Sequence, residues 1–434
     1  MSFMKKSAAT LVLTGVAAAT STALAAGFQL TEQSSLGAGR AYAGAGIVGD
    51  DLSAVHYNPA GMTLLEGTRF QAGGVWIGLN ADYSSDVSGE SENGRLKGQM
   101  IPAGYVTHQV NDQVWLGFAM TVPFGMGTEY SKDWEGADRG TNAKIYTFDM
   151  NPSIAWKVND FLSIGGGISV QYAKAELGMG VSGLGHGKVE ADSWDWGFNL
   201  GVMISPTEKL RFGLSYRSSI EHDAEGDTKL SGIVNPQLSN LLSGQNLDMS
   251  TTIETPDTVM LTGTWEATDK LRLSGLIRWA NWSNFDELNI KNELPTIVST
   301  SLSQLGQPGQ ALKAGLSNID IENDWQDTWL FSIGADYKIN SAFTVRGGIA
   351  YETSPIDDQS TRMAVIPDTD RVWLSLGASW YATKDLQFDV GATYLMGVGD
   401  KDLYNDLKSE GGKKIGEYDS LDAYLLGVQM QYRF

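Results

Sequence analysis

The chain ends in the stretch YLLGVQMQYRF, residues 424–434, in which apolar and polar side chains alternate. A period of two is typical of a β-strand whose two faces meet different surroundings. One face is apolar and carries Tyr424, Leu426, Val428, Met430, Tyr432 and Phe434. The other face is mostly polar and carries Gln429, Gln431 and Arg433. This terminal stretch predicts an all-β fold whose strands separate an apolar environment from a polar one.

The same alternation recurs upstream, in residues 210–217, 271–279 and 386–394. A soluble β-sandwich also alternates, but it buries its apolar face and has no aromatic residues at the strand ends. A membrane barrel turns that face to lipid and places aromatic residues at both water interfaces. We therefore expect a transmembrane antiparallel β-barrel.

The connections alternate in length, as in bacterial outer-membrane barrels, which have short periplasmic turns and long external loops. Six short turns are expected at 111–112, 159–160, 206–209, 268–270, 340–341 and 383–385. Seven longer loops are expected near 84–95, 131–141, 178–191, 227–250, 293–322, 354–366 and 399–418. Together they predict about fourteen strands, with both termini on the periplasmic side.

Residues 1–25 have the layout of a secretory signal peptide. Lys5 and Lys6 precede an apolar run, and the small residues Ala23 and Ala25 mark a cleavage point, so the mature chain is expected to begin at Ala26. No later stretch reaches the roughly 18 apolar residues that a transmembrane helix needs. Export without such a helix leaves the periplasm, the outer membrane or the medium, and the expected barrel selects the outer membrane of a bacterium.

Composition excludes several classes of partner and site. The net charge of −20 argues against nucleic acid, whose phosphates need a basic surface. The chain has no cysteine, which excludes disulfides and thiolate metal sites. The four histidines show no metal-ligand spacing, and no nucleophile-elbow sequence is present, so neither an enzyme nor a cofactor is expected.

Residues 26–66 lack strand alternation, unlike residues 67–434, and this difference predicts an N-terminal plug, or hatch, inside the barrel. Gly44 to Gly49 matches the dinucleotide-binding pattern, but no strand precedes it, so the glycines more plausibly allow tight turns in a confined lumen. Asp50 and Asp51 are expected to bond to arginines of the barrel wall, because two adjacent carboxylates are too few for a calcium site.

Pro123, Phe124 and Gly125 are expected to interrupt a strand, since proline donates no ladder hydrogen bond and glycine weakens a strand. Such a break either opens a gap in the wall or is a bulge that curves the barrel. Within residues 293–322, apolar side chains recur at near-helical spacing. Short helices there would either shelter an apolar ligand or pack on the barrel rim.

Several motifs in one order resemble the FadL family of outer-membrane long-chain fatty acid transporters, which includes aromatic-hydrocarbon channels. The resemblance covers the mature chain. It rests on residues 27–30, 39–42, 50–51, 58–60, 216–218, 279–285, 354–355 and 366–375.

This resemblance implies a fourteen-stranded barrel closed by the hatch. An apolar ligand is captured at external loops and passed to a deeper site near the mature N-terminus, lined by Phe28. It also implies a kink in the third strand at Pro123, Phe124 and Gly125. That kink opens the wall next to Asn58, Pro59 and Ala60 of the hatch. Read alone, Asn58-Pro59 indicates only a turn.

A fatty acid needs an apolar lining for its tail and a cation for its carboxylate. We expect inward-facing cations at Lys174, Arg217 and Arg371, with further arginines balancing inward acids such as Glu352 and Asp389. The family places basic residues around the ligand head, whereas this chain has Met179-Gly180 and Gln326 at the nearest matching positions. A neutral hydrocarbon therefore stays open as the ligand.

The sequence as a whole predicts a passive channel for hydrophobic compounds, foremost long-chain fatty acids. Its expected partners are that ligand, the lipid and lipopolysaccharide of the outer membrane, and the outer-membrane assembly machinery, with the protein itself a monomer. A surface adhesin or phage receptor, and a hydrophilic porin, are the alternatives. A porin predicts steady ion conductance, whereas a hatch predicts little.

Overall fold

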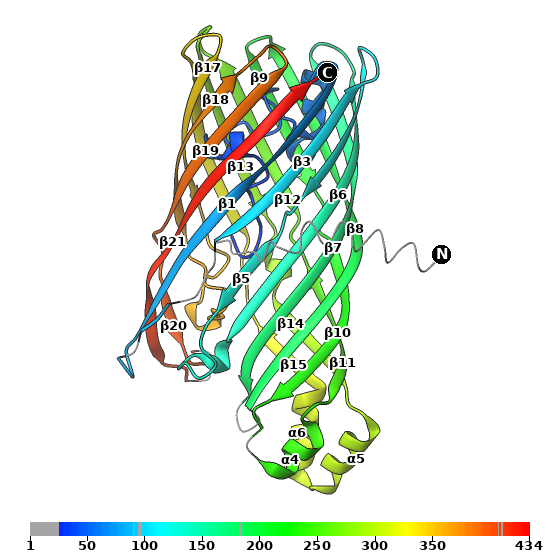
Figure 1. Ribbon diagram of the computed structural model, residues 1–434, viewed down its shortest axis with the longest axis vertical. Coiled ribbons are helices and arrows are strands. Elements are labelled where there is room, and N and C mark those ends of the chain that lie inside the picture. The colour runs from blue at the N-terminus through cyan, green and yellow to red at the C-terminus, as the bar shows by residue number, and fades with distance from the viewer. Residues whose placement is uncertain are drawn as a thin grey trace.

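The computed structural model describes residues 26–89, 91–93, 98–181, 185–233, 235–406, 408 and 411–434. The expected signal peptide, residues 1–25, lies outside the described residues. The chain forms a closed antiparallel barrel of fourteen strands, as predicted (Figure 1). Closure occurs where β1 (Thr68–Ser85) pairs with β21 (Lys414–Arg433), from Arg69 opposite Arg433 onward.

Between these two strands the wall continues through antiparallel neighbours, and β4 and β5 together form its third strand. The other wall strands are β3 (Gln99–Gln109), β4 (Val114–Thr121), β5 (Gly125–Glu129), β6 (Asn142–Lys157), β7 (Leu162–Val181), β8 (Gly185–Thr207), β9 (Leu210–Arg217), β12 (Thr258–Glu266), β13 (Leu271–Ala280), β16 (Thr328–Lys338), β17 (Phe343–Glu352), β18 (Arg371–Tyr381) and β19 (Leu386–Gly397).

Six short turns lie at one end of the barrel, at 110–113, 158–161, 208–209, 267–270, 339–342 and 382–385. These positions confirm the predicted turns. The C-terminus lies at the same end, so this end is periplasmic if the external loops are the long ones (Figure 1).

At the opposite end one side of the wall continues as an external extension. It consists of β10 (Glu221–Ser231), β11 (Asn246–Glu254), β14 (Glu287–Glu293) and β15 (Asn318–Glu322), together with the ends of β7 and β8. The prediction of a loop over 178–191 was therefore wrong for most of its length. The inner face of this extension is buried, whereas its outer face carries polar side chains that meet water, so the apolar outward face that marks the wall strands is absent there.

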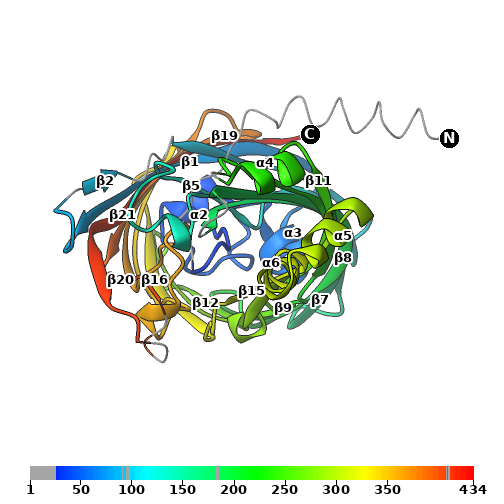
Figure 2. The same cartoon turned by 90° about the horizontal axis from the view of Figure 1, so that it is seen from below.

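Helices and short strands complete the external side. α5 (Thr296–Gln304) and α6 (Gln307–Ser317) confirm the helices expected within residues 293–322. Together with α4 (Pro236–Leu242) they lie over one side of the barrel opening (Figure 2). Val298, Leu302 and Leu316 of these helices are buried against Leu230 and Leu242. The shorter elements are β2 (Ser91–Asn93), β20 (Asp402–Tyr404), η2 (Ala137–Arg139), η3 (Trp282–Asn284) and η4 (Gln359–Thr361).

The N-terminal segment, residues 26–66, lies inside the barrel (Figures 1 and 2). It contains α2 (Ser35–Ala38), α3 (Ala54–Tyr57) and η1 (Pro59–Leu64). Gly44, Gly46 and Gly49 all have positive φ, which allows the tight turns expected in this confined space. None of the helices in the described residues is long and apolar enough to cross a membrane.

Candidate functional site

Phe28 is enclosed by four aromatic side chains that come from distant parts of the chain. Its ring centroid lies 4.7 Å from Trp282, 5.5 Å from Phe285, 5.9 Å from Trp325 and 6.1 Å from Phe124. We call these five residues the aromatic box. The Trp325 ring lies directly against the backbone of Gly27, since a Cβ atom at Gly27 would lie 2.4 Å from that ring. The box is a buried aromatic enclosure of the kind that binds hydrophobic ligands.

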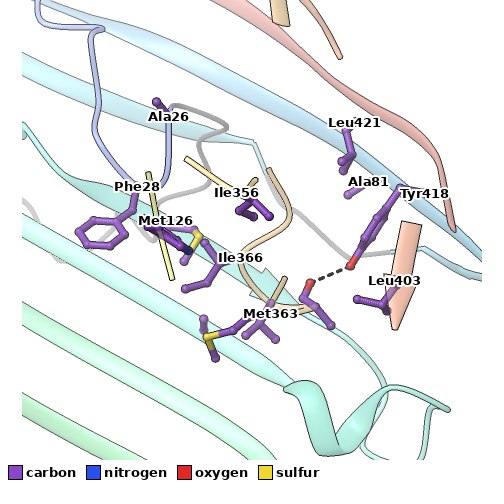
Figure 3. Packing of buried hydrophobic residues seen from close by; sticks show 14 of the residues in the cluster. Ala26, Phe28, Ala81, Met126, Ile356, Met363, Ile366, Leu403, Tyr418 and Leu421 are labelled. Carbon is purple, nitrogen blue, oxygen red and sulfur yellow. Dashed lines mark hydrogen bonds between the residues drawn. The ribbon is translucent and has the colours of Figure 1, made fainter. Parts of the chain in front are cut away.

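The apolar surface continues from the box toward the external side. In Figure 3, Met126 and Ile366 follow Phe28, and the cluster runs on to Tyr418 and Leu421. Leu177, Leu288 and Ile321 pack against this cluster and also against the apolar inner face of the external extension. That inner face is formed by Ala191, Ala224, Met249 and Ile290. Apolar side chains therefore line a continuous path from the external extension to Phe28.

The third wall strand is interrupted beside the box, at residues 122–124. β4 ends at Thr121, and β5 begins at Gly125. The pairing of β3 with β4 stops at Gly104 opposite Met120, and among the described residues β5 pairs only with β6. The hydrogen-bonded wall therefore lacks a β3–β5 ladder at this height, where the sequence predicted a break.

The N-terminal segment supplies the hydrogen bonds that the interrupted strand lacks. The amide of Gly125 donates to the Phe28 carbonyl at 2.9 Å, and the amide of Leu30 donates to the Pro123 carbonyl at 2.7 Å. The Gln33 side chain donates to the Val122 carbonyl at 2.7 Å and accepts from the Val122 amide at 3.2 Å. Buried backbone groups need such partners. The hydrogen bonding of the wall at the interruption is therefore complete only while residues 28–33 are docked there.

Asn58, Pro59 and Ala60 do not lie where the resemblance implied. The Asn58 amide donates to the carbonyls of Val202 and Leu214, on β8 and β9. A Cβ atom at Gly165, on β7, would lie 2.7 Å from the Ala60 nitrogen. These residues therefore pack on β7, β8 and β9, and the described contacts to the kink come from residues 28–33 instead. Wall glycines allow this close approach.

The opposite side of the N-terminal segment is held by buried ion pairs. Arg40 lies 2.8 Å from Asp50 and 3.4 Å from Asp336 on β16. Arg272 on β13 lies 3.1 Å from Asp50, and Arg346 on β17 lies 2.9 Å from Asp336. Although burial opposes ionisation, Arg40 and Arg272 hold the pKa of Asp50 well below its usual range. The bond of Asp50 to a wall arginine is confirmed.

Asp51 differs from this expectation, because its partners are neutral. It accepts hydrogen bonds from the Ser34 hydroxyl, from the Ser53 amide at 2.6 Å and from Gln71 at 3.2 Å. The two adjacent aspartates therefore anchor the segment to different neighbours.

A second charged cluster lies between the N-terminal segment and β13, β17 and β18. Arg278 lies 2.6 Å from Glu352, and Arg371 lies 2.6 Å from Asp368. Asp368 also accepts a 2.6 Å hydrogen bond from the Gly27 amide, one residue before Phe28. Both arginines pair with carboxylates, but the Nε and Nη1 atoms of Arg371, one of the predicted ligand-binding cations, have no hydrogen-bond partner among the described residues.

Glu32 is buried beside this cluster, and its Oε2 atom has no hydrogen-bond partner among the residues that the structure describes. Burial, together with the neighbouring Glu352 carboxylate, raises the pKa of Glu32 to about 8. Burial also raises the pKa of Asp368 to about 6, against the opposing charge of Arg371. The surroundings of Phe28 therefore disfavour added negative charge.

Arg217 faces the lumen, as predicted, and joins the wall to the N-terminal segment. It donates to Ser169 at 2.7 Å, to Asp149 at 3.3 Å and to the His56 carbonyl at 3.0 Å. It also lines a cavity of about 50 Å³ that reaches Leu30 and Phe124. Burial and the charge of Arg217 lower the pKa of His56 well below its usual value, so His56 is neutral.

Lys174 was expected to face the lumen, and this prediction was wrong. On β7 the buried side chains of Ser163, Ser169 and Gln171 point inward, whereas Ile168 points outward and is 55% exposed. The strand pairs without a register shift, so Lys174 is on the outward face, where it is exposed. Met179 lines an external cavity of about 450 Å³ with Arg139, Leu230 and Leu316.

The sequence did not identify Trp282, Phe285 and Trp325 as neighbours of Phe28. Trp282 and Phe285 belong to one of the stretches that carried the family resemblance, and this was the available signal. Trp325 lies in the segment between β15 and β16, and its contact with Phe28 depends on how two external segments fold over the lumen.

Comparisons with known proteins agree with this architecture. Residues 16–434 match the model of a family described as outer membrane protein transport protein (OMPP1/FadL/TodX). The long-chain fatty acid transport protein of Escherichia coli O6:H1 (strain CFT073) is 30% identical over 460 residues, covering 96% of this chain and 97% of that protein. Outer membrane protein P1 of Haemophilus influenzae (strain KW20) is 29% identical, covering 99% and 100%.

Solved structures share the fold. A Pseudomonas aeruginosa FadL homologue superposes with a TM-score of 0.80 at 23% identity, covering 94% of this chain and 100% of that chain. The Ralstonia pickettii toluene transporter TbuX superposes with a TM-score of 0.67 at 17% identity, covering 94% and 99%. At these identities the likeness concerns the fold alone.

Proposed function

Because this chain belongs to the FadL/TodX family of outer-membrane transport proteins, it is an outer-membrane transporter of hydrophobic compounds, and we propose that its substrates are long-chain fatty acids. Members of the family are transport channels and not enzymes. The fatty acid relative from Escherichia coli, which aligns over nearly the whole chain, supports this choice of substrate.

The observation that carries the proposal is the double role of Phe28. Its ring fills the aromatic box, and its carbonyl accepts the hydrogen bond from Gly125 at the wall interruption. An apolar ligand that enters the box competes with the Phe28 ring for the same surface. Displacement of Phe28 then removes hydrogen bonds that complete the third wall strand, and the wall opens sideways between β3 and β5.

The apolar path explains why a lateral route suits such ligands. Moving apolar surface through water costs about 25 cal/mol per Å². A ligand that follows the path from the external extension to Phe28, and leaves through the wall interruption, stays against apolar side chains. No energy source is needed, because the ligand moves down its own gradient.

Equilibrium binding tests the substrate. Purified, refolded protein, in a detergent that does not compete, is titrated with a long-chain fatty acid and with a neutral aromatic hydrocarbon of similar apolar area. Saturable preference for the acid is the expected result, with tighter binding in a Phe28→Ala variant, in which the ligand no longer competes with the ring for the box. Binding of neither compound, together with steady ion conductance in planar bilayers, contradicts the proposal and favours a porin.

One observation favours neutral aromatic hydrocarbons as a second candidate substrate. Arg278, which donates to Thr31, and Arg371, whose partner Asp368 accepts from the Gly27 amide, already form ion pairs with Glu352 and Asp368. A ligand carboxylate arriving there meets paired arginines and the buried Glu32. Preference for the neutral compound in the same titration selects this candidate.

A further inference from the structure

Ala26, the expected first residue of the mature chain, is buried inside the barrel. Its exposed fraction is 0%, and it lies in the apolar cluster that contains Phe28, Ile356 and Ile366 (Figure 3). The sequence predicts signal-peptide cleavage after Ala25. Cleavage there turns the backbone nitrogen of Ala26 from an amide into an α-amino group, whose pKa in water is about 8. Processing therefore places a new titratable group in an apolar part of the lumen.

The carboxylate of Asp368 lies next to this nitrogen. Its Oδ2 atom accepts a 2.6 Å hydrogen bond from the Gly27 amide. Backbone nitrogens of consecutive residues are about 3 to 3.7 Å apart, so the Ala26 nitrogen lies within roughly 6 Å of that Oδ2 atom. Consecutive backbone nitrogens can turn toward one anion, as they do in anion-binding nests. Once cleavage frees the Ala26 nitrogen, rotation about the Cα–C bond of Ala26 can bring it to the same carboxylate.

The buried charges around Asp368 lack one cation. Three carboxyl groups, those of Glu32, Glu352 and Asp368, meet two guanidinium groups, those of Arg278 and Arg371. The pKa values of Glu32 and Asp368 are both raised, chiefly by burial, and the Glu352 carboxylate raises both further. Buried carboxylates are stable when each has a cation or hydrogen-bond donors. An α-ammonium group supplies the missing positive charge.

A third arginine, Arg362, does not supply this charge. Its guanidinium donates to the backbone carbonyl oxygens of Asp368, Asp400 and Asp402. The carboxylates of these three aspartates all act on Arg362, so its single charge is shared among them. Asp402 has a further partner in Lys414, at 2.9 Å. The shortage of positive charge at the Asp368 carboxylate therefore persists when the neighbouring segments are included.

We propose that signal-peptide cleavage creates an α-ammonium group at Ala26 that pairs with the Asp368 carboxylate and thereby holds Phe28 in the aromatic box. Before cleavage the same nitrogen is an uncharged amide, so only the processed chain can form this pair. Asp368 keeps its 2.6 Å contact with Arg371 when the pair separates. The pair therefore strengthens docking of the N-terminus without preventing its release, and it does not depend on the transported compound.

The pKa of the Ala26 α-amino group tests the pair. Mature protein is purified from outer membranes, its first residue is identified by mass spectrometry, and the amine signal of isotope-labelled alanine is titrated by NMR in detergent. In the wild type the pKa should lie above the value of about 8 found in peptides. In Asp368→Asn it should fall below that value, because burial is then unopposed. The matched control is Asp370→Asn, which changes a carboxylate bonded to Tyr351 and Ser354 and should leave the pKa unchanged.

Hydrogen exchange at the Gly27 amide tests the effect on docking. The α-amino group is acetylated in urea at about pH 6.5, where lysine side chains stay protonated and unreactive, and the protein is then refolded. Acetylation should accelerate Gly27 exchange about tenfold in the wild type and in Asp370→Asn, as expected for loss of a pair that shifts a pKa by about one unit. In Asp368→Asn it should add nothing, because the partner is already absent.

Three results overturn the proposal. The first is a mature chain that begins at a residue other than Ala26. The second is a wild-type α-amino pKa of about 8 or lower. The third is an equal effect of acetylation in the wild type and in Asp368→Asn, which indicates packing of the N-terminus without an ion pair. The wild-type titration needs no variant, so it decides the question even if Asp368→Asn does not refold. All measurements are made without ligand and are therefore independent of the transport proposal.

Discussion

Two parts of the N-terminal segment, residues 27–33 and residues 34–51, are held to the wall by different forces. Residues 34–51 are fixed by buried ion pairs, including Arg40 with Asp50 and Asp336. Residues 27–33 are fixed by the aromatic box and by hydrogen bonds to the wall interruption. Removing one partner of a buried ion pair leaves an uncompensated charge, whereas an apolar ligand can replace an aromatic contact directly. Residues 34–51 are therefore an anchor, and we infer that residues 27–33 are the part that moves.

A disulfide between residues 27–33 and the wall should change fatty acid uptake more than any other variant. Gln29 and Phe124 form an antiparallel bridge, so Gln29→Cys/Phe124→Cys fits disulfide geometry, and the chain has no native cysteine to interfere. Oxidation should reduce fatty acid uptake to background, and reduction should restore it. Uptake of labelled fatty acid by cells, with and without reductant, measures this.

A second disulfide sharpens the comparison. A Cβ atom at Gly427 would lie 2.8 Å from the Ser35 Cβ. Ser35→Cys/Gly427→Cys can therefore join residues 34–51 to the wall once the two backbones move slightly apart. Uptake should continue in this oxidised variant. Equal loss of uptake in both locked proteins would show that the whole segment moves as one body.

Arg40→Gln tests the anchor. Asp50 and Asp336 lose a buried partner, and we expect a loss of about 3 to 5 kcal/mol in the free energy of unfolding. The control is Arg433→Gln, whose ion pair with Glu66 is exposed and should contribute at most about 1 kcal/mol. Urea unfolding in detergent measures both, and similar losses would show that the buried network is not an anchor.

Phe28→Ala tests how strongly residues 27–33 are docked to the wall. Loss of the aromatic ring should weaken docking of residues 27–33 by about 3 kcal/mol, which is about a hundredfold in the docking equilibrium. Hydrogen exchange at the Leu30 and Gly125 amides should accelerate accordingly. Phe70→Ala, on the lipid-facing side of β1, is the control and should leave this exchange unchanged.

Glu32→Gln should remove a pH dependence of docking. The carboxyl is protonated more readily when docked, with a pKa of about 8, than when released to water. Docking is therefore strongest at low pH and weakens as pH rises toward 8, by up to about 2 kcal/mol between pH 6 and 8. After correction for intrinsic exchange, the wild-type Leu30 amide should lose protection over this range and the variant should not. A wild type that gains protection contradicts the assignment.

Pro59→Ala should have the smallest effect. Pro59 begins η1 and lies against Gly165 and Gly201 of the wall, away from the interruption. Uptake should slow no more than about threefold, because a first-turn proline contributes mainly backbone rigidity. The barrel should assemble normally, which electrophoresis with and without heating checks. Normal uptake by the folded variant would remove Pro59 from the transport mechanism.

The sequence predicted those features that follow from local patterns. Alternation identified the strands, and Pro123 with Gly125 identified the interruption, because both depend on backbone geometry within a few residues. Lys174 was assigned to the lumen, although strand alternation predicts the outward face. Gln171 points inward, and a residue three positions later on an unbroken strand points outward.

What the sequence alone determined is the barrel, its turns and the break in its third strand, because period-two alternation and proline act locally on the chain. Tertiary structure alone decided that Phe28 meets Trp282, Phe285 and Trp325, and that Gln33 completes the backbone of Val122. These partners are separated by many residues in the chain. They meet only because barrel closure fixes where the external segments and the N-terminal segment lie, and no local propensity encodes that distance.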